Sequence, residues 1–161
     1  MAGISVDEQR RPFIVLVWCG DEAPEGVRIS HHEEVPGSPG AAPDPSPALT
    51  SVDDVDFVAP SLEGNIASVR LDAPGEGWTV EPEPFVLRPG VVYSAFGHRG
   101  YGSSQVNIGG FTFSAESVAK LKPGSVLLQA YDERWPSPDR GDVVVSSEEF
   151  KRQGQDPAQC E

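Results

Sequence analysis

Hydrophobic residues in much of the chain either alternate with polar residues or form short runs, and both patterns are typical of β-strands. Alternation is clearest in residues 66–71, where Ala67, Val69 and Leu71 share one face and the polar residues between them share the other. Residues 78–81 repeat the same period of two. A strand of this kind has one face on the core, so these two segments predict half-buried strands.

An early apolar run predicts a different kind of strand. Residues 13–19 are β-branched, aliphatic and aromatic without alternation, which is typical of a central strand buried on both faces. A turn rich in Gly, Pro and Asp follows, and residues 27–32 then alternate, so we expect these strands to form a hairpin with a long connection. Residues 1–11 are interpreted as a polar leader.

Two similar phrases, LRPGVVYSAFG in residues 87–97 and LKPGSVLLQAY in residues 121–131, predict different turns. In the first, Pro89 presets the first central angle of a type II turn and Gly90 tolerates the positive φ of the second, after which a strand begins. In the second, the Pro-Gly pair ends a helix that Ser114 caps at its start. A strand follows that helix.

The C-terminal third contains one irregular strand and a second helix. In residues 106–113 the apolar positions change phase at Gly109-Gly110, which predicts a β-bulge or a break in the strand. Residues 142–146 predict a strand, and the sequence from Ser146 to Glu149 matches a capping box at the start of a short helix.

Proline marks a segment that no sheet could use. Residues 36–48 are rich in proline, which lacks the amide hydrogen that a ladder needs, so this segment is predicted to be an irregular insertion. Residues 154–161 are predicted to form a flexible tail. The 161 residues suit a single domain over 1–161, and a content of 17 Gly and 16 Pro with 38% hydrophobic residues favours short strands and turns.

Four spaced residues, Leu87, Pro89, Gly90 and Tyr93, match the pattern Leu-x-Pro-Gly-x-x-Tyr. This resembles the tyrosine corner of fibronectin type III and related immunoglobulin-like β-sandwiches, where it stands at the entrance to the sixth strand. The predicted fold is therefore mainly β, an antiparallel immunoglobulin-like sandwich of about seven to nine strands with two short C-terminal helices. The expected core includes Leu16, Trp78, Val80, Leu87, Tyr93, Ile108, Phe111 and Leu128.

The net charge of the chain limits the classes of partner that it can bind. With 25 acidic and 12 basic residues the net charge is −13, which repels phosphate and anionic lipid, so we expect no nucleic acid and no membrane as a direct partner. A basic protein is the natural complement. The apolar run is short for an export signal, which predicts a cytoplasmic protein. In that setting Cys19 would be a buried thiol and Cys160 a free one, with a disulfide as the open alternative.

The candidate site is the loop of residues 97–104, which joins two predicted strands. It places His98, Arg99, Tyr101 and Ser103 on a glycine-rich tip. A rigid sandwich holds such loops out toward a partner, so these four residues are the predicted partner-binding residues. An ordinary solvated hairpin is the alternative.

Metal and catalytic chemistry find little support in the sequence. His31 and His32 are adjacent on a predicted strand and so point to opposite faces, which lets only one of them join any site. Asp53, Asp54 and Asp56 lack the glycine and glutamate of a calcium loop and predict a solvated acidic turn. There is no G-x-S-x-G elbow, and we assign no catalytic, cofactor or metal residues.

These patterns together favour a non-catalytic, acidic protein-interaction module. A concrete version is an inhibitor or immunity protein that covers the positive active site of a basic toxin or nuclease. The first alternative is a structural or assembly subunit of a larger complex, and the second is a small hydrolase. The sequence leaves the oligomeric state open.

Overall fold

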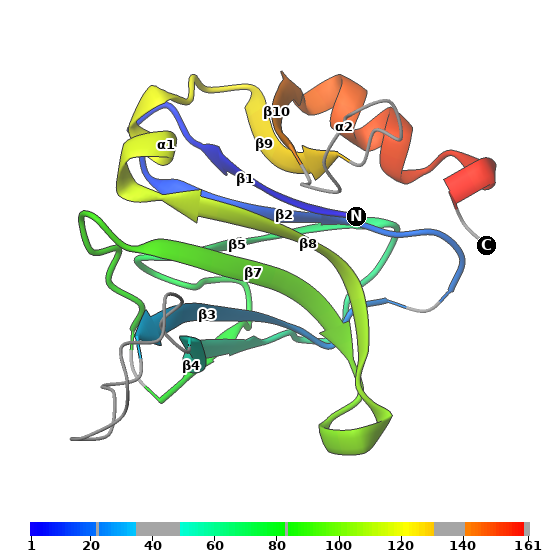
Figure 1. Cartoon of the computed structure of the whole chain (residues 1–161). Coiled ribbons are helices and arrows are strands. Elements are labelled where there is room, and N and C mark those ends of the chain that lie inside the picture. The colour runs from blue at the N-terminus through cyan, green and yellow to red at the C-terminus, as the bar shows by residue number, and fades with distance from the viewer. Residues whose placement is uncertain (22, 35–48, 83, 131–140, 160–161) are drawn as a thin grey trace.

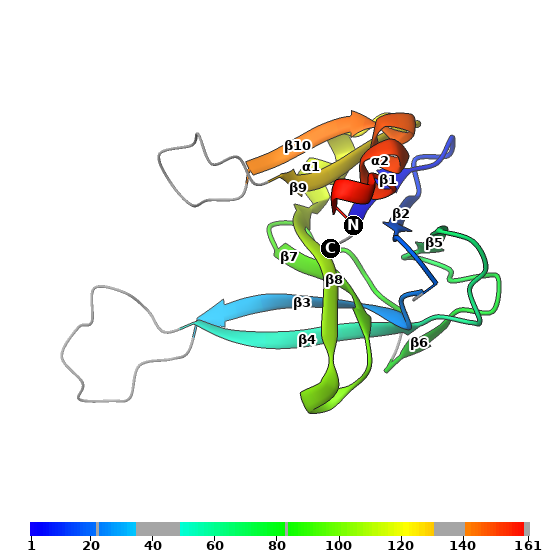
Figure 2. The same cartoon turned by 90° about the vertical axis from the view of Figure 1, so that its right-hand side faces the viewer.

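The computed structural model of the chain describes residues 1–21, 23–34, 49–82, 84–130 and 141–159. These residues form two antiparallel five-stranded sheets and two helices, so the prediction of a mainly β fold with two helices is confirmed. The sheets are stacked, as Figures 1 and 2 show from two directions. Ten strands are present in this part of the chain, more than the seven to nine predicted.

Sequence neighbours are divided between the two sheets. The first sheet has the order β10-β9-β1-β2-β5, made of Ala2–Val6 (β1), Pro12–Val17 (β2), Ile66–Arg70 (β5), Ser125–Ala130 (β9) and Gly141–Ser146 (β10). The second has the order β6-β4-β3-β7-β8, made of Gly26–Glu34 (β3), Leu49–Val58 (β4), Thr79–Glu81 (β6), Val92–Arg99 (β7) and Val106–Ser114 (β8).

Both helices begin where the sequence predicts. The Ser114 hydroxyl caps α1 (Ala115–Lys120), and the Ser146 hydroxyl caps α2 (Ser147–Gly154), each by accepting a hydrogen bond from an amide of the first turn. The second of the two similar phrases, Leu-Lys-Pro-Gly in residues 121–124, therefore ends a helix, as predicted. Helix α2 covers the face of the first sheet that points away from the second sheet, and it buries Phe150 there.

The main core lies between the sheets, and a smaller one lies under α2. Side chains from both sheets fill the main core, including Ile4, Ile14, Leu16, Ile29, Phe57, Tyr93, Phe111 and Phe113. The smaller cluster contains Val15, Val17, Val126, Leu128 and Phe150. Strand β2 contributes to both clusters, which confirms the prediction that it is buried on both faces.

Most of the predicted core residues are buried. Leu16, Trp78, Tyr93 and Phe111 lie in the main core, and Leu128 lies in the cluster under α2. The remaining three are half-buried: Val80, Leu87 and Ile108.

Tyr93 anchors the turn before β7 in the way that a tyrosine corner does. Its side chain is fully buried, and its hydroxyl accepts hydrogen bonds from the Arg88 backbone amide (3.2 Å) and from Arg88 Nε (3.1 Å). The ring packs on Phe85 and Phe113, with centroids 5.0 and 5.5 Å away. Gly90 has φ 74°, as the predicted type II turn requires.

Two predictions about the first strands are wrong. The predicted polar leader contains β1, whose five residues are all buried because the strand lies in the middle of its sheet with α2 on one side. The predicted hairpin between β2 and β3 does not form, because the chain crosses from one sheet to the other between Val17 and Gly26. The predicted bulge in β8 is confirmed: the register shifts at Gly109, which has φ 70°.

Predictions for the ends and the insertion have mixed outcomes. Residues 36–48 lie outside the described residues. Part of the predicted tail is folded, because Gly154 is buried in α2 and Pro157–Gln159 forms a 3-10 helix. No helix in the described ranges has the length and apolar character needed to cross a membrane.

Cys19 is disulfide-bonded, so its interpretation as a buried thiol is wrong, and the disulfide left open by the sequence is the alternative that agrees with the structure. Its sulfur lies 3.4 Å from the carbonyl oxygen of Gly154, at the end of α2. Cys160, the other cysteine of the chain, lies outside the described residues. Disulfides persist in oxidising compartments and are rare in the cytosol, which is the location predicted from the sequence.

We expect Tyr93→Phe to lower the free energy of unfolding by about 1 kcal/mol, because the buried hydroxyl loses its hydrogen bonds to Arg88. Tyr101→Phe is the matched control, since its hydroxyl has no hydrogen bond to the described part of the chain. Urea titration of both variants measures the difference. Equal effects of the two substitutions would contradict the tyrosine-corner interpretation.

Candidate functional site

The loop predicted to bind a partner is the turn of the β7–β8 hairpin, which projects beyond the second sheet in Figure 1. His98 and Arg99 are the last residues of β7, and Ser103 lies in a 3-10 helix, Gly102–Ser104. The structure separates the four predicted residues by exposure. His98 is fully buried and Arg99 half-buried, whereas Tyr101 and Ser103 are exposed.

His98 is the buried support of the hairpin turn. Its Nε2 lies 3.0 Å from Asp56 Oδ1, and its Nδ1 lies 3.3 Å from the carbonyl oxygen of Gly100. The ring of Tyr101 meets the imidazole edge-on, with centroids 5.3 Å apart at 73°. Tyr101 therefore rests on a histidine whose position is fixed by a carboxylate from another strand.

Further polar contacts tie the turn to β3 and to the residue before it. Arg28 on β3 donates to Asp56 at 2.8 Å and reaches the side-chain oxygen of Gln105 at 3.4 Å. The amide of Gly100 donates to the Glu25 carboxylate at 3.0 Å. Each contact joins residues far apart in the sequence, so the turn is held against the sheet although it is rich in glycine.

The exposed part of the turn carries one aromatic ring, Tyr101, with several carboxylates near it. Tyr101 is 49% exposed and Val106 is 52% exposed. Partial burial raises the pKa of Tyr101 above its ordinary value, and the nearby carboxylates of Asp56, Glu25 and Glu81 raise it further. We name this surface, made of Tyr101, Val106 and the residues between them, the hairpin tip.

A second polar cluster lies beside the tyrosine corner. His31 is buried, with Nδ1 2.6 Å from Asp54 Oδ2 and Nε2 2.9 Å from Glu33 Oε1. Arg88 reaches the other oxygen of Asp54 at 3.3 Å. The hydrogen bond to Asp54 raises the pKa of His31, and the bond to Glu33 adds to this effect while burial opposes it. His32 is exposed, so the two histidines take opposite faces, as predicted.

The predicted acidic turn is wrong, because Asp53, Asp54 and Asp56 all lie on β4. Asp54 and Asp56 accept hydrogen bonds from the two histidine-arginine clusters and are not simply solvated. In the described parts of the chain no group of three or more His, Cys, Asp or Glu side chains is placed to hold a metal ion.

The residues that hold the tip were not predicted from the sequence to have this role: Glu25, Arg28, Asp56 and Gln105. One signal was present, because alternation through β7 places His98 on the same face as Ser94 and Phe96, opposite the core residue Tyr93. That alternation could not show that the Asp56 carboxylate of β4 lies beside the His98 ring.

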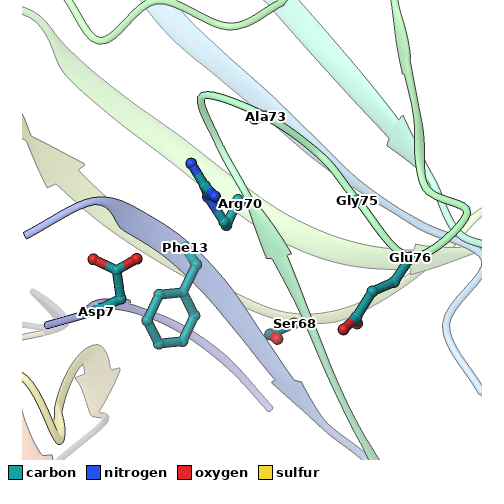
Figure 3. A pocket seen from close by; sticks show the side chains of 7 residues that line it. All are labelled: Asp7, Phe13, Ser68, Arg70, Ala73, Gly75 and Glu76. Atoms are coloured by element: carbon teal, nitrogen blue, oxygen red, sulfur yellow. The ribbon is translucent and has the colours of Figure 1, made fainter. Parts of the chain in front are cut away.

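Three surface hollows lie away from the tip. One of about 300 Å³ beside β5 is lined by Phe13, Ser68, Arg70 and Glu76 among others (Figure 3). A second, of about 380 Å³, shares Phe13, Ser68 and Glu76 with it and continues under α2. The third, of about 340 Å³, lies on β7 and β8 around Phe96. None of these three is lined by a histidine.

Neither buried histidine is placed to act as a general base. A general base needs a ring nitrogen facing the group it deprotonates. Both ring nitrogens of His98 face acceptors within the fold, and so do both ring nitrogens of His31. The arrangement is that of structural histidines and argues against a Ser-His hydrolase built on either one.

Comparisons with known proteins do not identify the chain. No family model matches it, and no curated protein or solved structure matches it either. The resemblance to fibronectin type III domains thus rests on the four residues of the turn motif.

We expect a pH dependence of stability that comes from His31. Because its pKa is raised on folding, protonated His31 stabilises the fold; this contribution is complete below the unfolded-state pKa of about 6.5 and disappears as the pH rises through the folded-state pKa. The free energy of unfolding of the wild type should therefore fall relative to that of His31→Gln as the pH rises. The exposed neighbour gives the control, His32→Gln, which should keep the wild-type profile. Parallel profiles for wild type and His31→Gln would refute this assignment.

Gly26→Ala tests the support of the tip, because an added Cβ would lie 2.6 Å from His98 Nε2 and 2.7 Å from the Phe57 carbonyl oxygen. We expect a loss of about 1–3 kcal/mol of stability and faster hydrogen exchange at the Gly100 amide. Gly75→Ala is the control, since nothing lies within 4 Å of its added Cβ. Unchanged exchange at Gly100 in the Gly26 variant would show that His98 does not fix the tip.

Proposed function

We propose that the protein is a non-catalytic interaction module that binds a basic protein through the hairpin tip. The observation that carries this proposal is the exposed ring of Tyr101, which packs on His98 at a turn supported by the buried His98–Asp56 pair. Tyrosine is among the residue types that dominate the energies of interfaces.

The contacts that hold the turn against the sheet favour binding, because binding must overcome the entropy lost when a loop is ordered. The Gly100 amide is bonded to Glu25, and the Ser104 hydroxyl donates to the Tyr101 carbonyl oxygen at 3.0 Å. Together with the His98 contact, these bonds order the turn before a partner arrives. The glycines then serve the shape of the turn and cost less affinity than they would in a loose loop.

Electrostatics favour a basic partner. The chain has a net charge of −13, and Tyr101 lies near the carboxylates of Glu25, Asp56 and Glu81. An Arg or Lys side chain laid on the exposed tyrosine ring would gain both a cation–π contact and attraction to these acids. An inhibitor or immunity protein for a basic toxin or nuclease is the concrete form of the proposal.

We also propose that the fold is immunoglobulin-like at its centre. The neighbours β1, β2 and β5 in one sheet and β4, β3, β7 and β8 in the other correspond to strands A, B, E and C′, C, F, G of such domains. Tyr93 then lies near the start of strand F, where a tyrosine corner belongs. On this assignment the hairpin tip is the F–G loop, one of the loops that carry binding in variable domains.

The alternatives receive less support. A structural subunit would need a large apolar contact, whereas the other exposed large hydrophobic residues, such as Leu49, Val86 and Val144, stand on separate elements. A small hydrolase built on either buried histidine would need a ring nitrogen that does not already face an acceptor within the fold. The disulfide at Cys19 favours an oxidising compartment over the predicted cytoplasm, since cytosolic thiols stay reduced.

Tyr101→Ala should weaken binding to the partner by about 1–3 kcal/mol, or roughly 5- to 150-fold in the dissociation constant. Val92→Ala is the control, because Val92 is 62% exposed at the other end of β7. Immobilised wild type and both variants are used to capture partners at about 0.1 M and about 1 M salt. We expect a basic protein that the wild type and the Val92 variant retain at low salt and release at high salt.

The Tyr101 variant should also lose some stability, since its ring packs on His98, and an aromatic pair of this kind contributes about 0.5–1.5 kcal/mol. Both variants are therefore compared under conditions where each is folded. If the Tyr101 variant captures the basic protein as well as the wild type does, the hairpin tip is not the binding surface.

A further inference from the structure

The strands at the margins of the two sheets differ in how well they are protected. A margin strand presents unpaired backbone N–H and C=O groups that could pair with another chain. Strand β6 offers only three residues. Strand β8 packs against β1 and β9, where Gln129 donates to the Thr112 hydroxyl at 2.9 Å. Beside β5 the chain turns back through Gly75 and Glu76, as Figure 3 shows.

Within the described residues strand β10 is less protected, although the Thr112 hydroxyl of β8 donates to the Asp142 carboxylate at 3.4 Å. It has six residues, contains no proline or lysine, and pairs with β9 without a register shift from Gly141 to Ser146. Its other side pairs with no strand in the described part of the chain. Figure 2 shows β10 at the margin of the first sheet, beyond β9. A regular strand of six residues that carries a single charge, Asp142, is a suitable template for one more strand.

The side chains of β10 alternate between a covered face and an exposed face. Val143 and Val145 are half-buried, and Val145 packs on the cluster under α2. Asp142, Val144 and Ser146 are exposed, and Val144 is 57% exposed. The apolar residue at the middle of the strand is therefore the one that lacks cover.

We propose that β10 of two copies of the chain pair antiparallel about a two-fold axis at Val144, so that two first sheets join into one. In this register Asp142 lies opposite the partner subunit's Ser146, and no like charges face each other. Val143 lies opposite the partner subunit's Val145. The two Val144 side chains meet directly, with Cβ atoms about 4.5–5.5 Å apart, and cover each other.

The charge of the chain predicts how this association depends on salt concentration. Two molecules of charge −13 repel each other, so pairing through a nearly neutral strand should strengthen as salt screens that repulsion. Binding of a basic protein at the hairpin tip should weaken with salt. The dimer does not depend on the proposed function, and the two can fail separately.

The experiment is sedimentation equilibrium of the full chain at protein concentrations up to about 1 mM, because a contact made by one strand pair is small and weak. It is run at about 0.1 M and about 1 M sodium chloride, where the Debye length is about 10 Å and about 3 Å. We expect a monomer–dimer equilibrium that is tighter at the higher salt concentration.

Val144→Lys places two like charges opposite each other at the axis and should raise the dissociation constant of the dimer at least about tenfold. Val92→Lys is the matched control: Val92 has similar exposure, makes the same change of charge, and lies on β7, which has a neighbour on each side. It should leave the dimer intact.

A second readout is hydrogen exchange of the wild type, in which the β10 amides that point away from β9 should exchange more slowly as the dimer forms. A wild type that stays monomeric up to about 1 mM at high salt overturns the proposal. So does a dimer that weakens with salt, or one that Val144→Lys and Val92→Lys affect equally.

Discussion

The carboxylate of Asp56 is the contact on which the second sheet and its hairpin tip depend. It extends from β4, accepts a hydrogen bond from Arg28 on β3 and lies 3.0 Å from His98 on β7, so one side chain joins three neighbouring strands on the outer face of the sheet. His98 is fully buried, and a buried imidazole without a polar partner would cost free energy. Because Asp56 supplies that partner, the sheet can bury a histidine under Tyr101 and hold an exposed aromatic ring above it.

A single irregularity in β4 allows a second acid to act on the opposite face. Residues two apart on a regular strand share a face, yet Asp54 and Asp56 serve different clusters. The register between β3 and β4 shifts between Ile29 and Ser30, where Asp54 has no Cα partner, and its carboxylate reaches His31 beside the tyrosine corner. The corner and the hairpin tip are thus both tied to β4, one on each side of the sheet.

Local sequence patterns predicted the elements but not their neighbours. Alternation found β3, β5 and β6, the Gly109 phase change located a bulge, and Ser114 and Ser146 marked both helices, because each of these signals acts within a few residues. Strand β1 was missed because its small residues precede a polar turn, and β4 was missed because acids break its alternation. The assignment of His98 to a flexible tip failed for a different reason: its burial depends on Asp56, which lies 42 residues earlier in the chain, and no local pattern contains that pairing.

The distribution of charge explains how an acidic chain can present an acidic surface and still fold around cations. Three basic side chains are each paired with a carboxylate of the same chain: Arg28, Arg88 and His31. Because these pairs join neighbouring strands and partly neutralise the positive charges, the three side chains attract an outside anion only weakly. Tyr101 stands next to acids that are exposed or only partly neutralised, such as Glu81. Folding therefore leaves carboxylates near an exposed aromatic ring, and the proposal of a basic partner rests on this arrangement.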